Sequence, residues 1–474
     1  MINDPKDELD SGLLERYLLP SRQQTIHYIQ NLKKPTVHQL LFEADKENNL
    51  LLQPRCGVGE HAKMLSLLQN LENKAHPNIL SLTIDAHTRL AKFDKATHIL
   101  KEAPDHLNGY PLVSHGWKLG QEINQAIKVP LEIRHGSPDA RLLFEMAIAS
   151  GITSFEGGGI CYNLPYCKEI PLSHSLDAWR YVDQLCGVLA QENIIVDREL
   201  FGTLTAVLMP PSISLAITML EGMLAAAQGV RCLSIACCQT GHFIQDIATL
   251  KAIRTLSKKF ISNQVDVFPV FHEYMGPFPK ERFEAEALIF YGALTAVKGK
   301  ATKLITKTYE EALGIPSVDA NIAGIWTARM ASSNIFDFIV IEQEAVEEEE
   351  FWIIRETEEI LEPILQHENM YQAITDGFAQ GTLDIPFSAS RYAHSNILPM
   401  RDQSGAIRYH RFGNLKLSDT TKRRNTKLLQ DSLLHKANNS LFTKIEGDIL
   451  YFSKPAYKKH IQSEQSLYEK YSNL

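Results

Sequence analysis

Several charged side chains follow short apolar segments, at points where strands are expected to end. Arg55 follows LLLQP, Arg89 lies just past LSLTID, Arg134 and His135 close LEIRH, and Glu156 closes GITSFE. In parallel β/α folds these positions meet at the carboxyl edge of the strands, where ligands bind. A guanidinium matches a carboxylate, so three arginines at one mouth suit a small substrate with two carboxylates, and a glutamate among them can hold an amino group. For any arginine taken alone, a structural ion pair is the better interpretation, and only the joint placement favours a site.

A second candidate is the run FEGGGICYNLPY, residues 155–166, in which three glycines permit unusual dihedral angles and close approach. The run lacks the lysine and hydroxyl residue of GxxxxGK[ST], and Tyr162 stands where GxGxxG needs its third glycine. A nucleotide-phosphate loop is therefore weakly supported. Two interpretations remain open: a tight turn after a strand, or backbone against which a large flat ligand lies.

A third candidate is KTYEEALGIP, which follows the apolar run LIT. Lys307 and Glu311 are four residues apart, so in a helix they share one side and could contact neighbouring polar groups of a ligand. Taken alone, an ordinary ion pair between them is the preferred explanation. His272 and Glu273 mark one more strand end, in FPVFHEYMG.

The elements that would position these residues alternate between strand and helix from about residue 46 to 335. The expected strands are apolar throughout, which is typical of parallel strands buried on both faces. They include residues 79–85, 110–116, 130–136, 151–158, 203–210, 231–238, 265–272 and 303–308. Repeated strand-helix units of this number favour a (β/α)₈ TIM-type barrel over an open doubly wound sheet.

The chain on either side of this barrel, residues 46–335, has a different character. Residues 1–45 are charged and are expected to form a helical lead-in. Residues 336–474 form a C-terminal α+β extension, which begins with the glutamate-rich stretch IEQEAVEEEEFWIIRETEEILEPILQH. Its amphipathic pattern predicts a helix whose glutamates form a solvated face.

Composition limits the function classes. The chain has 48 basic and 56 acidic residues, a net charge of −8 and 44% hydrophobic residues, which predicts a globular protein without affinity for nucleic acid or anionic membranes. The most apolar stretch, SLAITMLEGMLAAAQGV, carries Glu221 at its middle, so no membrane span is expected. The start MINDPKDELDSG lacks the features of a signal peptide, which indicates the cytoplasm. Seven cysteines without a CxxC pair predict free thiols and no metal site.

Read together and in order, the motifs resemble the large (epsilon, or E) chain of glutamate mutase, also called methylaspartate mutase. The resemblance covers most of the chain and runs through LQPRCGVG, TIDAHTR, NGYP, IRHGSPDARLL, FEGGGICYNLPY, DRELFGTL, PPSIS, QTGHFIQDIA, FHEYMGPFP, KTYEEALGIPSVDAN and LPMRDQSGAIRYHRFGNL. It implies a (β/α)₈ barrel enzyme that uses adenosylcobalamin to interconvert L-glutamate and (2S,3S)-3-methylaspartate.

The resemblance also implies roles for the matching residues. Arg55, Arg89 and Arg134 would clamp the substrate carboxylates, with His135 beside them. Glu156 would meet the substrate amino group and exchange a proton with it. Tyr162 and Tyr166 would complete the substrate pocket, and the glycines before them would leave room for tight packing beneath it.

On the cofactor side, the resemblance implies a set of residues that contact adenosylcobalamin: Gly57, Asn108, Pro165, Phe278, Lys307, Glu311 and Ile315. Lys307 and Glu311 would hold the ribose and adenine of the adenosyl group. Gly57 and Pro165 would permit close contact with the corrin.

The implied chemistry is homolysis of the cobalt–carbon bond, hydrogen abstraction from glutamate, fragmentation to a glycyl radical and acrylate, and recombination to the branched skeleton. In the family, a histidine of a separate small chain carrying DxHxxG ligates the cobalt. This chain has no such motif, because Asp85 and His87 are followed by Leu90 where glycine is required. A small cobalamin-binding partner is therefore expected, in an assembly with two copies of each chain.

Some positions depart from the family pattern: Cys56, Cys161, Cys237, Cys238 and Pro277. None of them replaces an implied substrate ligand. Two alternatives to an active glutamate mutase chain remain open: a catalytically silent scaffold of the same fold, and a mutase acting on a related small amino or dicarboxylic acid.

Overall fold

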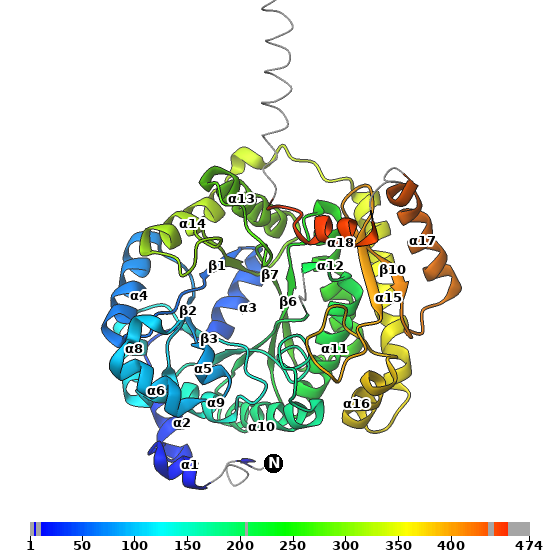
Figure 1. Ribbon diagram of the computed structural model, residues 1–474. Coiled ribbons are helices and arrows are strands. Elements are labelled where there is room, and N and C mark those ends of the chain that lie inside the picture. Colours follow the sequence, from blue (N-terminus) through cyan, green and yellow to red (C-terminus); the bar gives the residue numbers. More distant parts are fainter. Residues whose placement is uncertain (1–3, 6–10, 204–206, 435–439, 454–474) are drawn as a thin grey trace, which may run out of the picture.

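The computed structural model describes residues 4–5, 11–203, 207–434 and 440–453. Eight parallel strands form a ring in the order β1-β8-β7-β6-β5-β4-β3-β2, surrounded by helices (Figure 1). The strands are β1 (Leu51–Pro54), β2 (Leu80–Thr83), β3 (Leu131–Arg134), β4 (Ser154–Glu156), β5 (Asp197–Leu200), β6 (Cys232–Cys238), β7 (Asp266–His272) and β8 (Lys303–Thr306). The expected α/β TIM-type barrel is confirmed.

The ring closes between its first two strands without a regular ladder. The backbone N–H of Thr83 donates to Cys56 O at 2.9 Å, and the N–H of Asn78 donates to Leu52 O at 3.0 Å. At the amino end of the ring, α3 (Val37–Glu47) packs Val37 and Leu41 against residues of β1, β6 and β7. The barrel is therefore covered at this end, and its other end carries the loops that follow the strands.

The outer layer consists of helices that connect successive strands. They are α4 (His61–Ala75), α5 (Ala86–Arg89), α6 (Phe93–Glu102), α7 (Leu112–His115), α8 (Trp117–Ala126), α9 (Arg141–Ala149), α10 (Leu172–Gln191), α11 (Pro211–Ala227), α12 (Phe243–Phe260), α13 (Arg282–Lys298) and α14 (Val318–Met330). Among the described residues, no helix combines the length and the apolar character that crossing a membrane requires. The apolar α11 is instead buried on nearly all sides between the barrel and the C-terminal helices.

Two of the expected strands are wrong. Residues 110–116 contain the short helix α7, and only Tyr110 forms an isolated bridge, with Ile84. The range 203–210 forms no strand at its described residues; residues 204–206 lie outside the described part. The fifth strand is instead the earlier segment DREL, and the first is LLQP, the apolar run before Arg55.

The strand DREL is not evident from an apolar pattern because Asp197 and Glu199 are buried in the barrel interior and Arg198 is buried against α10. Lys303 Nζ lies 2.5 Å from Glu132 Oε2 and 2.7 Å from Glu199 Oε2. Arg134 Nη1 lies 2.5 Å from Glu132 and 3.1 Å from Glu199. Asp197 accepts hydrogen bonds from Ser154 and Ser234 at 2.9 and 2.7 Å. The barrel interior is thus an ion-pair layer, and an apolar pattern does not reveal strands that face such a layer.

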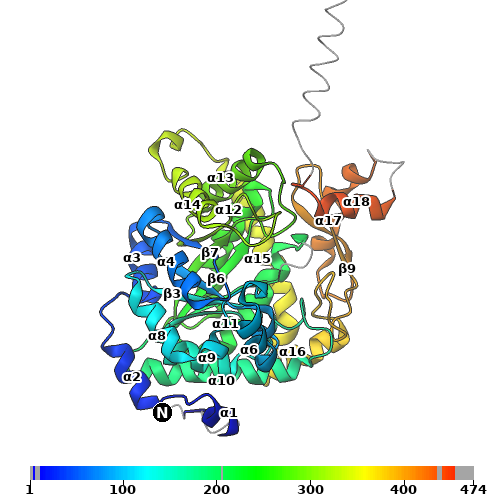
Figure 2. The same cartoon turned by 60° about the vertical axis from the view of Figure 1, so that its left-hand side comes forward.

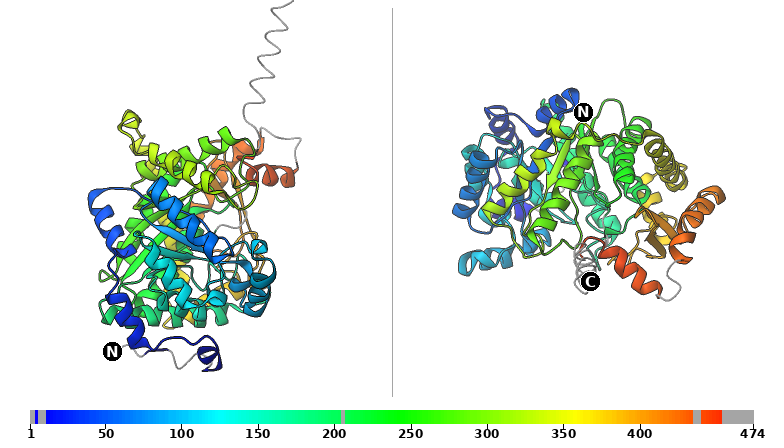
Figure 3. Two further views of the ribbon diagram at one scale, coloured as in Figure 1. Left: turned by 90° about the vertical axis from the view of Figure 1, so that its left-hand side faces the viewer. Right: turned by 90° about the horizontal axis from the view of Figure 1, so that it is seen from above.

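The chain before the barrel is helical, as expected, with α1 (Ser11–Arg16) and α2 (Arg22–Gln30) ahead of α3. Figure 3 shows α1 and α2 at one end of the molecule and α17 and α18 near the other. Arg22 of α2 forms an ion pair with Glu145 of the outer barrel helix α9, with Nη2 2.7 Å from Oε1. The lead-in is therefore attached to the outer helices.

The chain after the barrel forms a layer of helices and a β-hairpin against one side of the ring (Figure 2). Its elements are α15 (Gln343–Leu365), α16 (Met370–Gln380), β9 (Ile397–Arg401), β10 (Ile407–Phe412), α17 (Asp419–Leu434) and α18 (Leu441–Ile449). Helix α15 packs along α11 and α12. The α+β character of the extension is confirmed, whereas its limits as a domain stay a prediction.

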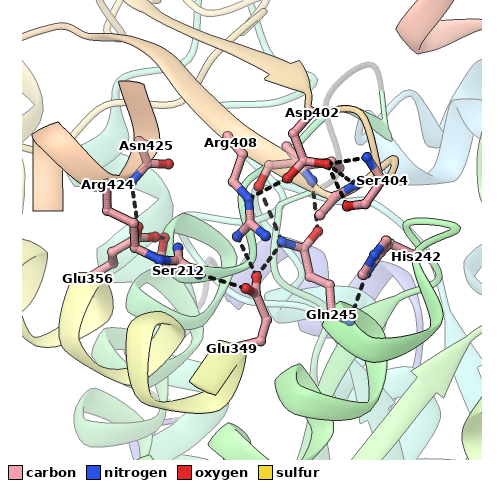
Figure 4. A network of polar contacts seen from close by, with 12 residues as sticks. Ser212, His242, Gln245, Glu349, Glu356, Asp402, Ser404, Arg408, Arg424 and Asn425 are labelled. Carbon is pink, nitrogen blue, oxygen red and sulfur yellow. Dashed lines mark hydrogen bonds and ion pairs between the residues drawn. The ribbon is translucent and has the colours of Figure 1, made fainter. Parts of the chain in front are cut away.

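A buried polar network joins this extension to the barrel helices (Figure 4). Arg408 of β10 lies 2.5 Å from Glu349 of α15 and 2.9 Å from Asp402. Gln245 of α12 donates to Glu349 at 2.8 Å, and Glu356 of α15 accepts from Ser212 of α11 at 2.8 Å. The expectation that the glutamates of α15 form only a solvated face is therefore wrong for Glu349 and Glu356, which are buried.

Replacing Arg408 with methionine is expected to lower the free energy of unfolding by about 2 to 3 kcal/mol, the range for charged hydrogen bonds lost inside a protein. Asp402 loses its guanidinium partner, whereas Glu349 keeps Arg424 at 2.8 Å. Urea unfolding measures the change. Arg411→Met on the exposed face of the same strand is the control, and equal effects of the two substitutions would contradict the role of the network.

Candidate active site

Two adjoining cavities lie beyond the carboxyl ends of the strands. The first cavity, of about 320 Å³, is lined by the predicted residues Arg55, Arg89, His135, Glu156, Tyr162 and Tyr166. The second cavity, of about 240 Å³, is lined by the predicted residues Gly57, Asn108, Lys307, Glu311 and Ile315, and again by Arg55. The structure therefore gathers most of the predicted substrate residues and most of the predicted cofactor residues into neighbouring spaces that share Arg55.

Arg55 and Arg89 bring two cationic groups to the first cavity. In the described part of the chain neither arginine makes an ion pair with a carboxylate. Arg55 Nη1 donates to the sulfur of Met275 at 3.7 Å, and its Nε is buried without a hydrogen-bond partner among the described residues. Burial, together with the charge of Arg55, lowers the pKa of Arg89. Two such guanidinium groups facing one cavity have the charge and the donor geometry that carboxylates require.

Arg134 lies beneath the first cavity and does not line it. Its side chain is 1% exposed and forms ion pairs with Glu132, Glu156 and Glu199. Arg134 is the last residue of β3 and points into the barrel interior, where its charge is balanced by these carboxylates. The structure thus brings two of the three predicted arginines to the cavity. The third, Arg134, forms an ion pair with Glu156, which lines the cavity.

Glu156 is the acidic group of the first cavity. Burial raises the pKa of its carboxyl to about 7, and the neighbouring Glu199 and Glu132 add to this effect against the opposing charge of Arg134. A carboxyl with a pKa near neutrality can gain and lose a proton under physiological conditions. Glu156 is therefore suited to exchange a proton with a ligand.

Glu156, Glu199 and His272 have potential ligand atoms within 4.8 Å of one another. Arg134 already lies among them, paired with both glutamates and 3.5 Å from His272 Nε2. Burial lowers the pKa of His272 to about 4, so its ring is neutral. The cluster has the character of an ion-pair network in which Arg134 supplies the positive charge.

An aromatic wall forms the side of the first cavity next to Glu156. The ring of His135 stacks on Trp179, with centroids 5.7 Å apart, and meets Tyr162 edge-on at 5.0 Å. His135 Nδ1 accepts the backbone N–H of Ser137 at 3.0 Å, and burial lowers the pKa of His135 well below its usual value. The neutral imidazole therefore carries its proton on Nε2.

Gly157, the first glycine of the run, is required by this wall. Its φ is +111°, and a Cβ there would collide with the ring of Tyr162 and lie 2.8 Å from Trp179. Of the two interpretations of the run, the turn after a strand therefore has a direct structural reason at this position. Tyr166, farther along, lies at the rim and is 53% exposed.

The second cavity contains one ion pair. Lys307 Nζ lies 2.7 Å from Glu311 Oε2, so the two residues form the ordinary ion pair that the sequence predicts. Both groups also line the cavity. Asn108 accepts the N–H of Ala86 at 2.9 Å. Packing within the chain itself requires glycine at position 57, because a Cβ added there would lie 2.5 Å from the carbonyl oxygen of Thr83.

Two predicted residues line neither cavity. Phe278 is buried in a cluster with Tyr274 and Leu288, and Pro165 is buried in the loop between Tyr162 and Tyr166. Conversely, Phe201 and Met275 line the first cavity and were not predicted. Phe201 follows the missed strand β5, so recognising DREL as a strand would have indicated it.

Comparison with known proteins identifies the family of the chain. The family model of the methylaspartate mutase E chain (MutE) matches residues 33–455. The glutamate mutase epsilon subunit of Desulfitobacterium hafniense is 38% identical over 411 residues, which are 84% of this chain and 85% of that protein. The glutamate mutase epsilon subunit of Yersinia enterocolitica is 38% identical over 437 residues, 88% of this chain and 90% of that protein. The chain therefore belongs to the methylaspartate mutase E chain family and is a mutase subunit.

Proposed function

We propose that this chain is the large catalytic subunit of an adenosylcobalamin-dependent mutase that interconverts L-glutamate and (2S,3S)-3-methylaspartate. The observation that carries the proposal is the pair of adjoining cavities that share Arg55. One cavity has the charges that a dicarboxylic amino acid needs, and the other has polar groups suited to a nucleoside. In this proposal residues 46–335 are the catalytic domain.

In the first cavity, Arg55 and Arg89 bind the two carboxylates of the substrate, and Glu156 binds its ammonium group. Two fixed guanidinium groups can hold both carboxylates while the carbon fragment between them migrates, which is catalysis by positioning. Tyr162 and His135 form the wall that excludes water from the reacting carbons. Glu156 takes up or returns the ammonium proton because its pKa lies near 7.

The residues of the second cavity fit the adenosyl group of the cofactor. Lys307 offers ammonium donors and Glu311 a carboxylate acceptor, which match the acceptors and the hydroxyl groups of a nucleoside. Their side chains are only 7% and 21% exposed, so water hydrates them poorly. A polar ligand here supplies hydrogen bonds in place of that water. When bound, the cofactor supplies the radical that removes and returns a substrate hydrogen.

A partner chain is part of the proposal. The family name of the matching relatives, epsilon subunit, implies an assembly of different chains. This sequence has no DxHxxG segment to ligate cobalt. A small cobalamin-binding chain therefore supplies the histidine, in an assembly of two large and two small chains.

Reconstitution tests the proposal. The purified chain is mixed with a small cobalamin-binding chain of demonstrated competence, adenosylcobalamin and L-glutamate. The expected results are formation of 3-methylaspartate and a cobalamin radical signal that depends on glutamate. If the mixture binds cofactor and gives neither product nor signal, the chain is not a glutamate mutase subunit; turnover of another dicarboxylic acid would redefine its substrate.

The arginine assignment gives a separate prediction. Arg55→Lys and Arg89→Lys are each expected to raise KM for glutamate about 10- to 100-fold, because a lysine cannot make the paired bonds of a guanidinium. Initial rates of the reconstituted enzyme measure the effect. Arg180→Lys on the outer helix α10 is the matched control, and unchanged KM in both cavity variants would refute the assignment.

A further inference from the structure

Glu221 is a buried acid that the proposed function does not use. It lies in the middle of α11, is 4% exposed, and makes no ion pair within the described residues. Its Oε1 accepts the backbone N–H groups of Ile160 and Cys161 at 2.7 and 3.0 Å. The helix after β5 thus holds the loop that follows β4.

The loop is shaped to receive this carboxylate. A Cβ on Gly158 would lie 2.5 Å from Glu221 Cδ, so any side chain there would displace the acid. Gly157 leaves room for Tyr162 in the same way, and Gly159 lies near the backbone of Leu176. The glycine run therefore accommodates an acid on one side and an aromatic ring on the other.

The two hydrogen bonds to Glu221 come from Ile160 and Cys161, the residues that directly precede Tyr162 in the chain. The N–H of Tyr162 donates to Gly158 O at 3.2 Å, which closes a helical turn over residues 158–162. Tyr162 then lines the first cavity beside Glu156 and packs on His135. A shift of this turn would carry the tyrosine ring away from the cavity.

We infer that Glu221 is a positioning residue of the active site, whose carboxylate fixes the turn at residues 158–162 and thereby holds Tyr162 against Glu156. The role of this placement of Tyr162 in catalysis rests on the proposed function. The hydrogen bonds by which Glu221 holds the turn do not depend on it. Above about pH 7, where Glu221 is ionised, its carboxylate binds the two backbone N–H groups more strongly than a neutral amide would.

The ionisation of Glu221 provides an independent signature. Burial raises the pKa of the Glu221 carboxyl to about 7, although the hydrogen bonds from the two N–H groups favour the ionised form and lower it. The charged or titratable groups that face Glu221 are the Cys161 thiol of the loop and Arg198 of β5. The native state then keeps a proton that the unfolded chain releases at a lower pH, so this residue's contribution to stability falls as pH rises toward 7. Glu221→Gln removes the titration, and its Tm relative to wild type is expected to rise between about pH 5 and pH 8.

Amide hydrogen exchange of the chain without substrate tests the anchoring. Glu221→Leu is expected to accelerate exchange at Ile160 and Cys161 at least tenfold, and Glu221→Gln, which keeps an acceptor, by much less. If the leucine variant does not fold, Glu221→Asp, whose shorter side chain loses the reach, replaces it. Glu356→Leu on α15 is the control, because Glu356 is also buried with a raised pKa and lies in the network that joins α15 to α11. Unchanged exchange in the Glu221 variants would overturn the inference.

Kinetics of the reconstituted enzyme test the consequence. Glu221→Leu or Glu221→Asp is expected to raise KM for glutamate about tenfold, with recovery toward wild type in Glu221→Gln and no change in Glu356→Leu. Equal increases in KM in the Glu221 and Glu356 variants would show a general loss of stability and overturn the positioning role. A wild-type enzyme without mutase activity would refute the proposed function, while the exchange result would still decide whether Glu221 holds the loop.

Discussion

Replacing Glu156 with glutamine is expected to lower kcat/KM for glutamate about 10²- to 10³-fold, the range for loss of a group that exchanges protons or balances charge in a closed site. The glutamine keeps the size of the side chain, but it neither attracts an ammonium group nor accepts its proton. Loss of the negative charge also leaves Arg134 with Glu132 and Glu199 as its carboxylate partners among the described residues. Steady-state kinetics of the reconstituted enzyme measure the effect.

The same substitution is expected to change the pH profile. In the proposed reaction the ammonium group of glutamate binds the ionised form of Glu156. The kcat/KM of the wild-type enzyme should therefore rise with pH to about 7 and then level, since burial sets the pKa of Glu156 near that value. The Glu156→Gln enzyme should lack this rise. Because the native state retains the Glu156 proton that the unfolded chain has released, the stability of Glu156→Gln relative to wild type should also rise as pH rises toward 7. A Glu356→Gln control that lost the same pH limb would contradict the assignment.

Replacing Lys303 with methionine is expected to lower the free energy of unfolding by about 3 to 5 kcal/mol, the cost of leaving a buried ion pair without one partner. Lys303 is fully buried and lies 2.5 Å from Glu132 and 2.7 Å from Glu199. These carboxylates raise the pKa of Lys303 despite its burial, so the lysine is charged in the folded chain. Methionine has a similar length but leaves Arg134 as the cation that both carboxylates still share among the described residues.

Urea unfolding at two pH values measures this effect. The deficit of Lys303→Met is expected to be smaller near pH 5 than near pH 8, because burial raises the pKa of Glu132 and its protonation removes one uncompensated charge. Lys251→Met on α12, which is 38% exposed, is the control and should change stability by less than about 0.5 kcal/mol. Equal stability of wild type and Lys303→Met would show that the interior ion pairs contribute nothing.

The strands illustrate which parts of the fold local pattern can reveal. The segments that became β6, β7 and β8 are apolar, β-branched runs, and they were predicted close to their observed limits. Strand β5 is not evident from the sequence because Asp197, Arg198 and Glu199 are charged and become buried only when other elements supply their partners. Neighbouring strands supply them for Asp197 and Glu199, and Asp183 of α10 supplies one for Arg198. Residues 110–116 have the composition of a strand but form a helix, since no neighbouring strand pairs with them beyond Tyr110.

The candidate site shows the same limit. Arg55, Arg89, His135 and Glu156 were predicted to share one mouth because they follow strands, and the structure brings them to one cavity. Arg134 was predicted in the same way, but its direction depends on the carboxylates of β3, β4 and β5. Phe278 and Pro165 were named through resemblance, and side-chain packing places both outside the two cavities.

The sequence by itself determined the barrel class, the family and the positions of charged residues at strand ends, because these depend on local periodicity and on motifs in a fixed order. Only the tertiary structure decided which charges are free and which are paired. Arg55 and Arg89 face a cavity without a carboxylate partner among the described residues, whereas Arg134 and Lys303 are neutralised within the barrel, and Glu221 of a distant helix holds the glycine turn. The physical reason is that an ion pair or a buried hydrogen bond depends on distance and burial, which arise only when segments far apart in the chain are packed together.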